Sequence, residues 1–189
     1  SQSQCRYIAR MDADDVSMAT RLEKQISFLN ENPEIGLVAT RVNFKGNTLS
    51  HQGYAHYVDW TNSLVTSKDI RTHRFIESPI AHPSVMFRRK LTKKSENIYQ
   101  SGHFPEDYEL WLRWMDEGVK MAKLPEFLVD WYDLPDRLSR TDKRYSPSAF
   151  YETKAIYLAS WISRFVSADR PIWIWGAGRV SRRRSQMLA

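Results

Sequence analysis

The sequence predicts an α/β protein with a mixed sheet flanked by helices, and three observations support this fold class. Short apolar runs of strand type occur at residues 7–11 and at residues 35–42. A stretch of helix length lies between them, beginning near Thr20 and ending at Asn32. The alternation of strands and helices of these lengths is typical of α/β folds. We therefore expect the first two strands to pair in parallel.

Composition excludes several classes of protein. The chain has 189 residues, of which 42% are hydrophobic and 13% aromatic, as in a folded globular domain. No apolar run approaches the roughly 20 residues of a membrane-spanning helix, and the start shows no signal-peptide pattern. Cys5 is the only cysteine, so no disulfide forms within the chain. We expect the protein to be cytoplasmic. Peripheral attachment to the inner face of the plasma membrane is compatible with this expectation. The net charge of +6 suits an anionic partner.

The first strand ends at three carboxylates, Asp12, Asp14 and Asp15. Burying unpaired carboxylates is costly, so we expect them where solvent or a cation meets them. Carboxylate oxygens are hard ligands suited to Mg²⁺ or Mn²⁺, which in turn bind the phosphates of a nucleotide. An Asp-x-Asp at a strand end therefore indicates a metal and diphosphate site. The alternative is a polar turn that caps the next helix.

That next helix carries a capping-box pattern, Thr20 with Glu23. Asp15 and Ser17 are alternative caps. The predicted apolar stripe has helical spacing and consists of Leu22, Ile26 and Leu29.

Residues 50–80 show no clear periodicity, apart from a short helix expected at residues 66–75. His51 and His56 are interpreted as surface residues. A turn then leads into a strand expected at residues 84–87. His82 precedes a proline, which restricts its backbone, and by itself it is interpreted as a hydrogen-bonded structural histidine.

A second important helix begins at Pro105, after a polar loop expected at residues 93–102. Its first turn carries Glu106 and Asp107, which either favour the positive end of the helix dipole or place a catalytic base at a rigid helix start. The apolar stripe of this helix consists of Leu110, Trp111, Trp114 and Met115. Gly118 is a natural end for it.

Two strands are expected next, at residues 119–124 and 127–132, linked around Pro125. A polar loop with Arg137 and Arg140 follows. Ser146 and Pro147 then begin a long helix. We expect it to pack on the core through a stripe that consists of Tyr151, Ala155, Leu158, Ile162 and Phe165.

The last segment, residues 169–189, is interpreted as the start of a further Rossmann-like unit. Residues 171–175 are apolar and strand-like, and Gly-Ala-Gly follows them, as in a dinucleotide-binding turn. The predicted organisation is therefore residues 1–145 as one domain, residues 146–168 as a long helix, and residues 169–189 as the beginning of another unit.

Four segments in this order resemble the family-2 glycosyltransferases of GT-A fold, over about residues 8–145: RMDADD, RLEKQISFLNENPEIGLVAT, SPIAHPSVMFRR and PEDYELWLRW. The resemblance implies that residues 1–145 form a partial GT-A catalytic domain, the nucleotide-diphospho-sugar transferase fold. It also implies transfer of a sugar, with inversion, from a nucleotide-sugar donor, a UDP-sugar first of all. The acceptor would be a hydroxyl of a cell-surface polysaccharide or a lipid-linked glycan, in bacterial polysaccharide biosynthesis.

The resemblance assigns roles on the donor side. Asp12 and Asp14 would bind Mn²⁺ or Mg²⁺ together with the donor diphosphate. Asp15 beside them would help to hold the loop at the substrate. Arg137 and Arg140 lie in a loop that resembles a segment closing over the diphosphate, which two arginines would suit.

It also assigns roles on the acceptor side. Glu106 and Asp107 match the Glu-Asp pair of the family, in which Asp107 would be the general base that deprotonates the acceptor hydroxyl. His82 matches a strand that borders the acceptor site.

The chain departs from the family pattern at its start, where the valine- and isoleucine-rich strand that holds the nucleotide base is absent. We therefore expect the sheet edge at residues 6–11 to be open, or covered by another copy in a homo-oligomer. The Gln-x-x-Arg-Trp motif of processive members is also absent, which favours transfer of a single sugar. The alternative function is a catalytically inactive fragment that acts as a binding or assembly module. A nucleic-acid binder ranks last, because the arginines at residues 182–184 accompany no recognition motif.

Overall fold

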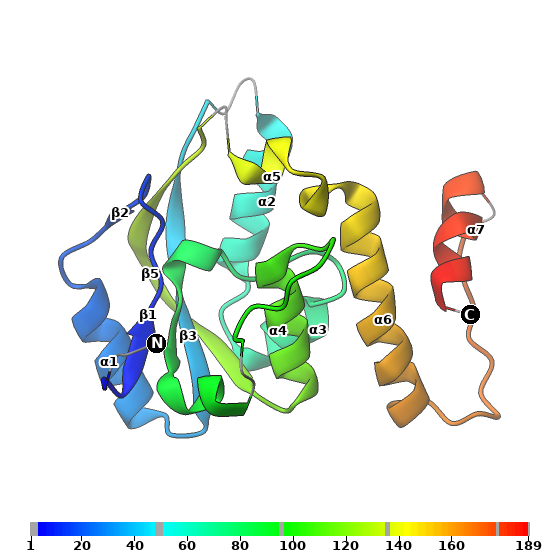
Figure 1. The fold of residues 1–189 in the computed structure, drawn as a ribbon, viewed down its shortest axis with the longest axis horizontal. Helices are drawn as coiled ribbons and strands as arrows, with labels where there is room; N and C mark the ends of the chain where they lie inside the picture. The colour runs from blue at the N-terminus through cyan, green and yellow to red at the C-terminus, as the bar shows by residue number, and fades with distance from the viewer. Residues whose placement is uncertain (1–3, 48–50, 95–96, 135–136, 177, 189) are drawn as a thin grey trace. The chain divides into compact units, whose positions relative to one another are not determined.

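The computed structural model consists of β-strands and α-helices (Figure 1), and the chain divides into two units, each described by itself. Residues 1–98 and 118–137 make up the first unit, and residues 99–117 and 138–189 make up the second. The parts of the chain that the structure describes are residues 4–47, 51–94, 97–134, 137–176 and 178–188. The predicted domain limits after residues 145 and 168 remain a prediction.

The first unit is built on a five-stranded mixed sheet with the strand order β1-β4-β3-β5-β2, as the predicted fold class requires. Its strands are β1 (Tyr7–Ala9), β2 (Val16–Ser17), β3 (Ile35–Lys45), β4 (Met86–Arg88) and β5 (Lys120–Tyr132). β3 and β5 pair in parallel, whereas the other three pairings are antiparallel. β1 lies at one edge and pairs, among the described strands, with β4 alone.

The predicted parallel pairing of the first strand with β3 is wrong, because β4 lies between them. Phe87 of β4 is opposite Ile8 on one side and opposite Leu37 on the other, antiparallel in both cases. β1 and β3 therefore run in the same direction but are not hydrogen-bonded to each other. Sequence proximity favoured a direct pair, but the inserted strand comes from much later in the chain.

β5 is one long strand, whereas the sequence predicted two strands linked around Pro125. Its register on β3 shifts between Leu124 and Phe127, so Pro125 and Glu126 have no partner there. Proline lacks the N–H that a ladder needs, and a bulge is where a strand tolerates it. The strand continues through the proline because both halves keep the same neighbour.

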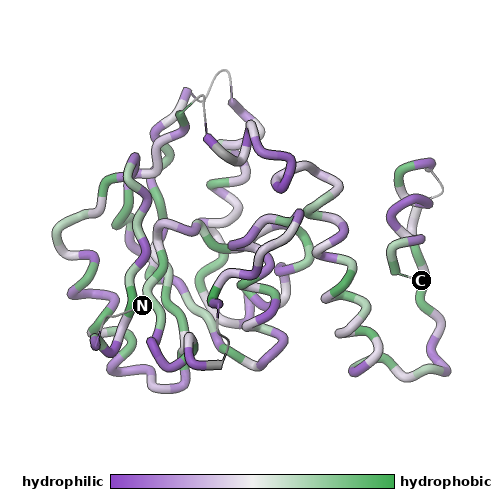
Figure 2. Tube along the Cα trace, in the orientation of Figure 1, coloured by the Kyte–Doolittle hydropathy of each residue, from purple (hydrophilic) through white to green (hydrophobic). Residues whose placement is uncertain are grey.

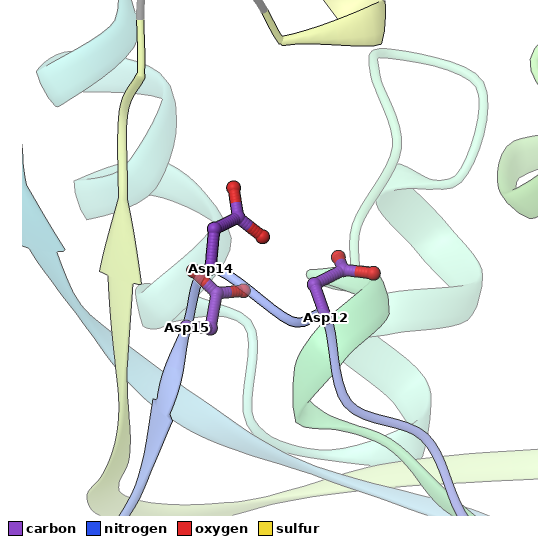
Figure 3. Close-up of side chains that lie close together, drawn as sticks. All are labelled: Asp12, Asp14 and Asp15. Carbon is purple, nitrogen blue, oxygen red and sulfur yellow. The ribbon is translucent and has the colours of Figure 1, made fainter.

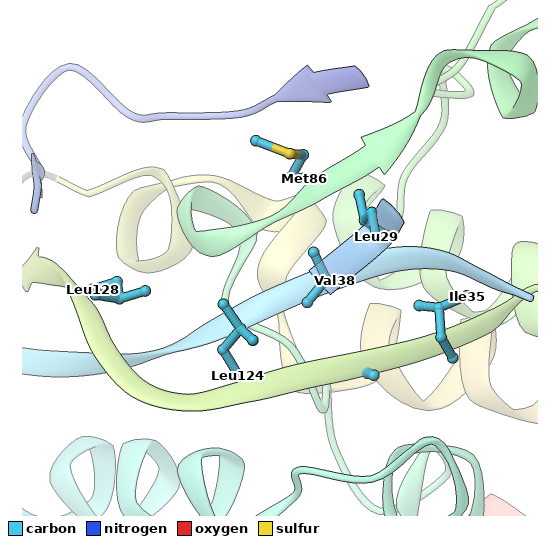
Figure 4. Close-up of a cluster of buried hydrophobic side chains, with 7 residues drawn as sticks. Leu29, Ile35, Val38, Met86, Leu124 and Leu128 are labelled. Atoms are coloured by element: carbon cyan, nitrogen blue, oxygen red, sulfur yellow. The ribbon is translucent and has the colours of Figure 1, made fainter. Parts of the chain in front are cut away.

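Two hydrophobic clusters pack helices onto this sheet, and hydrophobic residues are concentrated along its central strands (Figure 2). The first cluster joins α1 (Arg21–Glu31) to the sheet and consists of Leu29, Ile35, Val38, Met86, Ala122, Leu124 and Leu128 (Figure 4). The second joins α2 (Gln52–Ser63) to it and consists of Val42, Val58, Ala81, Val129 and Trp131. The sheet is thus flanked by helices, as the fold class predicts.

The predicted apolar stripe of α1 is wrong at two of its three positions. Leu22 and Ile26 are 49% and 39% exposed, and the buried residues are Arg21, Gln25 and Leu29. The polar pair is buried because backbone carbonyl groups from other elements accept its hydrogen bonds. The predicted capping box is also not formed, since Thr20 makes no side-chain cap bond.

The rest of this unit agrees with the sequence-based expectations in part. The expected short helix is confirmed as α3 (Ser67–His73), which a capping box of Thr66 and Asp69 begins. α2 was not anticipated, since its polar and aromatic residues have no clear period. The expected strand at residues 84–87 is observed as β4, slightly later, after a short 3₁₀ helix (His82–Ser84). A second 3₁₀ helix (Arg89–Lys94) follows it.

The second unit contains α4 (Glu106–Asp116), α5 (Leu138–Thr141), a 3₁₀ helix (Lys143–Tyr145), α6 (Pro147–Phe165), α7 (Arg179–Ser185) and a final 3₁₀ helix (Gln186–Leu188). The predicted stripe of α4 is confirmed, because all four residues are buried. Pro105 is the N-cap and not the first helical residue. α5 and the 3₁₀ helix after it occupy the segment that was expected to be a polar loop.

The long helix α6 starts where the sequence predicts it. Ser146 accepts a hydrogen bond from the Ala149 amide at 3.3 Å, as an N-cap serine should. Its predicted stripe is buried at Ala155, but Phe165 at the far end is exposed. None of the described helices is long and apolar enough to cross a membrane.

The strand predicted at residues 171–175 is wrong. These residues form no regular structure, and Trp173 and Trp175 are exposed. A strand needs a neighbour for its backbone N–H and C=O groups, and none of the described strands pairs with this segment.

Candidate functional site

The three carboxylates that the sequence singles out lie together in the turn between β1 and β2 (Figure 3). One oxygen from each of Asp12, Asp14 and Asp15 lies within 4.8 Å of the other two. Asp14 is exposed, and the other two are partly buried. The Asp15 amide donates to the Asp12 carbonyl at 3.3 Å, which closes the turn. Three carboxylate oxygens at this spacing match the ligand type that Mg²⁺ and Mn²⁺ prefer.

Asp15 has surroundings that the other two carboxylates lack. Its Oδ1 accepts a hydrogen bond of 2.9 Å from the Tyr132 amide, whereas its Oδ2 is buried without a hydrogen-bond partner. Burial raises the pKa of the Asp15 carboxyl, the charge of Asp14 adds to the rise, and the Tyr132 amide opposes it. A buried, unpartnered oxygen beside two other carboxylates is an arrangement that a bound cation would complete. The residues present therefore fit a divalent metal.

The interpretation of these aspartates as caps of α1 is not supported. Thr20 is the N-cap of that helix, and no side chain makes a cap hydrogen bond there. Asp12 instead forms an ion pair with Arg10 through Nη1 of the arginine. Sequence reasoning missed Arg10, although an arginine two positions before the acidic motif was a signal that was available.

His82 lies in the 3₁₀ helix before β4 and is partly buried. Burial, and next the positive charge of Arg10, lower the pKa of His82 to about 3. Its imidazole is therefore neutral at physiological pH and serves as a hydrogen-bonding group, not as a cation for a phosphate. Its place beside an acceptor remains a prediction.

Arg137 is held against α2 and the end of β5. Its Nη1 donates to the Tyr54 hydroxyl at 2.9 Å, and its Cζ lies 4.8 Å from the centre of the Trp131 ring. Asp133 Oδ1 lies 3.8 Å from the same Nη1. Burial raises the pKa of Asp15, and the charge of Arg137 opposes that rise, so this arginine contributes to the field at the carboxylate turn. It is thus fixed in place by aromatic and acidic partners.

Arg140 lies on α5 in the second unit and is exposed. The predicted pair of arginines is therefore divided between the two units. The roles of Arg137 and Arg140 at a diphosphate remain predictions.

Glu106 and Asp107 occupy the first turn of α4, as expected. The Tyr145 hydroxyl lies 2.6 Å from both carboxylate oxygens of Glu106, and Arg144 Nη1 lies 3.9 Å from Oε2. Burial raises the pKa of Tyr145, and the hydrogen bond to Glu106 raises it further, so the phenol keeps its proton and donates. Asp107 Oδ1 accepts the amide of Tyr108 at 2.7 Å.

These contacts distinguish the two acids. Glu106 is bound by a tyrosine 39 positions away, which no local pattern in the sequence signals. That contact uses part of the hydrogen-bonding capacity of Glu106, as the Tyr108 amide does for Asp107. The catalytic roles of Glu106 and Asp107 remain predictions.

Residues 1–95 match the family model described as Glycosyl transferase family 2. An uncharacterized glycosyltransferase of Methanocaldococcus jannaschii is 33% identical over 148 residues, which cover 74% of this chain and 47% of that protein.

Two Escherichia coli proteins match more of the chain. The O-antigen biosynthesis glycosyltransferase WbnJ is 29% identical over 169 residues, with 86% of this chain and 60% of that protein covered. A UDP-Gal:alpha-D-GlcNAc-diphosphoundecaprenol beta-1,3-galactosyltransferase is 25% identical over 164 residues, with 85% and 57% covered. The chain therefore spans about half the length of the curated relatives it matches.

Proposed function

Because the chain belongs to glycosyl transferase family 2, we propose that it carries the metal site and the catalytic base of a sugar-transfer enzyme. The donor is a nucleotide sugar, and the acceptor is a hydroxyl of a glycan or a lipid-linked glycan. The observation that carries the proposal is the cluster of Asp12, Asp14 and Asp15. The names of the two Escherichia coli relatives support a UDP-sugar and a polysaccharide or polyprenyl-linked acceptor.

On the donor side, Asp12 and Asp14 would hold Mn²⁺ or Mg²⁺. The ion, when bound, offsets the negative charge of the leaving diphosphate. Asp15 holds the turn through the Tyr132 amide, and one of its carboxylate oxygens lies within 4.8 Å of oxygens of Asp12 and Asp14. Arg137 and Arg140 are proposed to add positive charge at the diphosphate.

On the acceptor side, Asp107 is the proposed general base, and His82 is proposed to border the acceptor. The acceptor oxygen attacks the anomeric carbon, the bond from that carbon to the diphosphate oxygen breaks, and the hydroxyl proton passes to Asp107. A single displacement of this kind inverts the anomeric centre. The start of α4 suits the base, because the positive end of a helix dipole favours an ionised carboxylate. Glu106, bound by Tyr145, fixes the position of this helix start.

The donor half of the proposal is tested by calorimetry with UDP and Mn²⁺. We expect the chain to bind UDP only when Mn²⁺ is present, and Asp14→Ala to abolish that binding. Asp59→Ala is the matched control, since Asp59 is an exposed aspartate of α2 in the same unit. Equal binding with and without Mn²⁺, or equal binding by Asp14→Ala, would refute the metal site.

The acceptor half is tested by the release of nucleoside diphosphate from a panel of nucleotide sugars in the presence of acceptor. In an intact enzyme that contains this chain, Asp107→Asn should slow transfer by about two to four powers of ten, the usual contribution of a positioned base, and should leave Mn²⁺ binding intact. A rate unaffected by Asp107→Asn removes this residue from the mechanism. Metal-dependent binding of UDP without any transfer favours the alternative of a binding module.

A further inference from the structure

A buried guanidinium lies next to the carboxylate turn, that of Arg21, the first residue of α1. Only 1% of Arg21 is exposed. Its Nη2 donates to the carbonyl of Arg10 at 2.8 Å and to that of Val85 at 3.3 Å. Its Nη1 lies 3.0 Å from the sulfur of Met11, and its Nε donates to Gln25 Oε1 at 3.1 Å. Every face of the guanidinium that carries N–H groups is thus occupied.

These contacts fix the segment that leads into the turn. Arg10 and Met11 directly precede Asp12, and the Arg10 amide donates to the same Val85 carbonyl at 3.0 Å. The exit of the turn is fixed separately, where the Tyr132 amide binds Asp15. The carboxylates therefore lie between two anchors, and at the entry the anchoring side chain is that of Arg21.

Gln25 extends the entry anchor into the sheet. Its Nε2 donates to the carbonyl of Val38 at 3.1 Å and to that of Ser84 at 2.9 Å. Arg21 and Gln25 thus connect α1, β3, the residues before β4 and the carboxylate turn. Polar groups that are buried and satisfied in this way hold their neighbours in one arrangement.

Arg21 also has no ion-pair partner within 4.0 Å among the described residues. Burial lowers its pKa to about 10, and the charge of Asp15 acts in the opposite direction, so the group is a cation at neutral pH. A buried cation without a paired carboxylate is costly. Carbonyl contacts and the nearby turn are what offset this cost.

We propose that Arg21 is a positioning residue that holds Asp12, Asp14 and Asp15 at the spacing a divalent cation requires. The inference rests on the metal site of the proposed function. A nearby positive charge repels a bound cation, so charge repulsion alone would make metal binding tighter when the arginine is removed. If Arg21 instead positions the carboxylates, its removal should weaken metal binding.

The same unit offers a matched control, Arg88. It too is buried, and it donates to the carbonyls of Leu29, Asn32 and Ile35 at 2.6, 3.1 and 2.8 Å. These contacts tie β4 to the far end of α1 and to β3. Among the residues that the structure describes, Arg88 makes no hydrogen bond or ion pair to the carboxylate turn. A change there disturbs the same unit without touching the entry anchor.

The experiment titrates Mn²⁺ into the chain and follows free Mn²⁺ by electron paramagnetic resonance. Arg21→Lys keeps the charge but loses the planar fork, and it should weaken Mn²⁺ binding about ten- to a hundredfold, as loss of an outer-shell partner does. Arg88→Lys should change the Kd less than about twofold by the same reasoning. Equal losses in both variants, or unchanged or tighter binding in Arg21→Lys, overturn the proposal.

Amide hydrogen exchange without metal separates this proposal from the proposed function. The amides of Arg10 and Tyr132 should exchange faster in Arg21→Lys than in Arg88→Lys. If the unchanged chain binds no Mn²⁺, the metal site is refuted, and the exchange rates alone decide whether Arg21 positions the turn. If Arg21→Lys does not fold, Met11→Leu removes one contact of the guanidinium and should accelerate the Arg10 amide alone; no acceleration overturns the proposal.

Discussion

The backbone amide of Tyr132, at the end of β5, donates a hydrogen bond of 2.9 Å to Oδ1 of Asp15, a residue 117 positions earlier in the chain. Directly after Asp15, β2 pairs with β5, with Val16 opposite Asp130. The carboxylate turn is therefore completed by β5, the last of the described strands along the chain. Its geometry exists only in the folded unit, so metal binding by these carboxylates should be coupled to folding.

Asp15→Asn should stabilise the metal-free chain. Burial, the largest cause, raises the pKa of Asp15 in the folded chain above its ordinary value of 3.8. As pH rises past 3.8, Asp15 therefore loses its proton in the unfolded chain before it does so in the folded chain. Stability therefore falls as pH rises through this interval, and the loss persists at neutral pH. Asparagine keeps an oxygen for the Tyr132 amide and has no charge.

We expect the free energy of unfolding of Asp15→Asn to rise by roughly 0.5–1 kcal/mol at neutral pH, the scale of a single-site change. At about pH 3 Asp15 is protonated in both the folded and the unfolded chain, so the unchanged chain and Asp15→Asn should be equally stable. Urea unfolding at the two pH values measures this. A less stable variant at neutral pH would contradict the assignment of burial as the cause.

Lys123 should make the free energy of unfolding rise with pH above about 7. This lysine of β5 is 3% exposed, and burial lowers its pKa from 10.5 to about 7. Its Nζ donates to the Thr61 carbonyl and lies 3.3 Å from the Pro79 carbonyl. Between these pKa values the unfolded chain holds the proton and the folded chain does not, so stability rises as pH rises.

The expected rise is about 2 kcal/mol between about pH 7 and pH 9, since one pKa unit is worth about 1.4 kcal/mol. Lys123→Met should abolish it. The variant leaves no carbonyl orphaned, because Thr61 Oγ1 donates to Pro79 at 2.7 Å and the Leu64 amide donates to Thr61 at 3.2 Å. A pH dependence retained in the variant would show that another group titrates.

Tyr145→Phe should loosen Glu106 and destabilise the second unit. It removes a hydroxyl that lies 2.6 Å from both carboxylate oxygens, and a hydrogen bond to a charged group contributes about 1.5–3 kcal/mol. Tyr157→Phe is the control, because it removes a similar bond of 2.6 Å to Glu109 on the same helix. Denaturant unfolding should show comparable losses in both.

Only Tyr145→Phe should change the pH dependence of sugar transfer, because only Tyr145 binds the neighbour of the proposed base. The measurement is the pH profile of kcat for both variants, in a protein that contains this chain and is active. Identical profiles for the two variants would show that Glu106 has no influence on the base.

Helix α4 shows what a local pattern predicts well. Its apolar stripe, its acidic first turn and its end before Gly118 lie within one short stretch of sequence. Gly118 has φ of +84°, the left-handed conformation that ends helices and that glycine adopts without strain. Each of these signals depends on neighbours three or four positions away, so no distant partner is needed to interpret it.

Helix α1 shows where such patterns fail. Leu22 and Ile26 predict the buried face by hydropathy, yet Arg21 and Gln25 are buried in their place. Their partners are carbonyls 11 to 64 positions away, on segments whose proximity the sequence does not reveal. Lys123 is a similar case, since a lysine is normally expected at the surface.

The sequence by itself determined the family, the fold class and the three carboxylates, because side-chain chemistry and short-range periodicity are carried by adjacent residues. Tertiary structure alone decided which groups surround those carboxylates. β4 entered between β1 and β3, Arg21 closed the entry of the turn, and Tyr132 closed its exit. These contacts join segments far apart in the chain, and buried polar groups find such partners only when the whole sheet has formed.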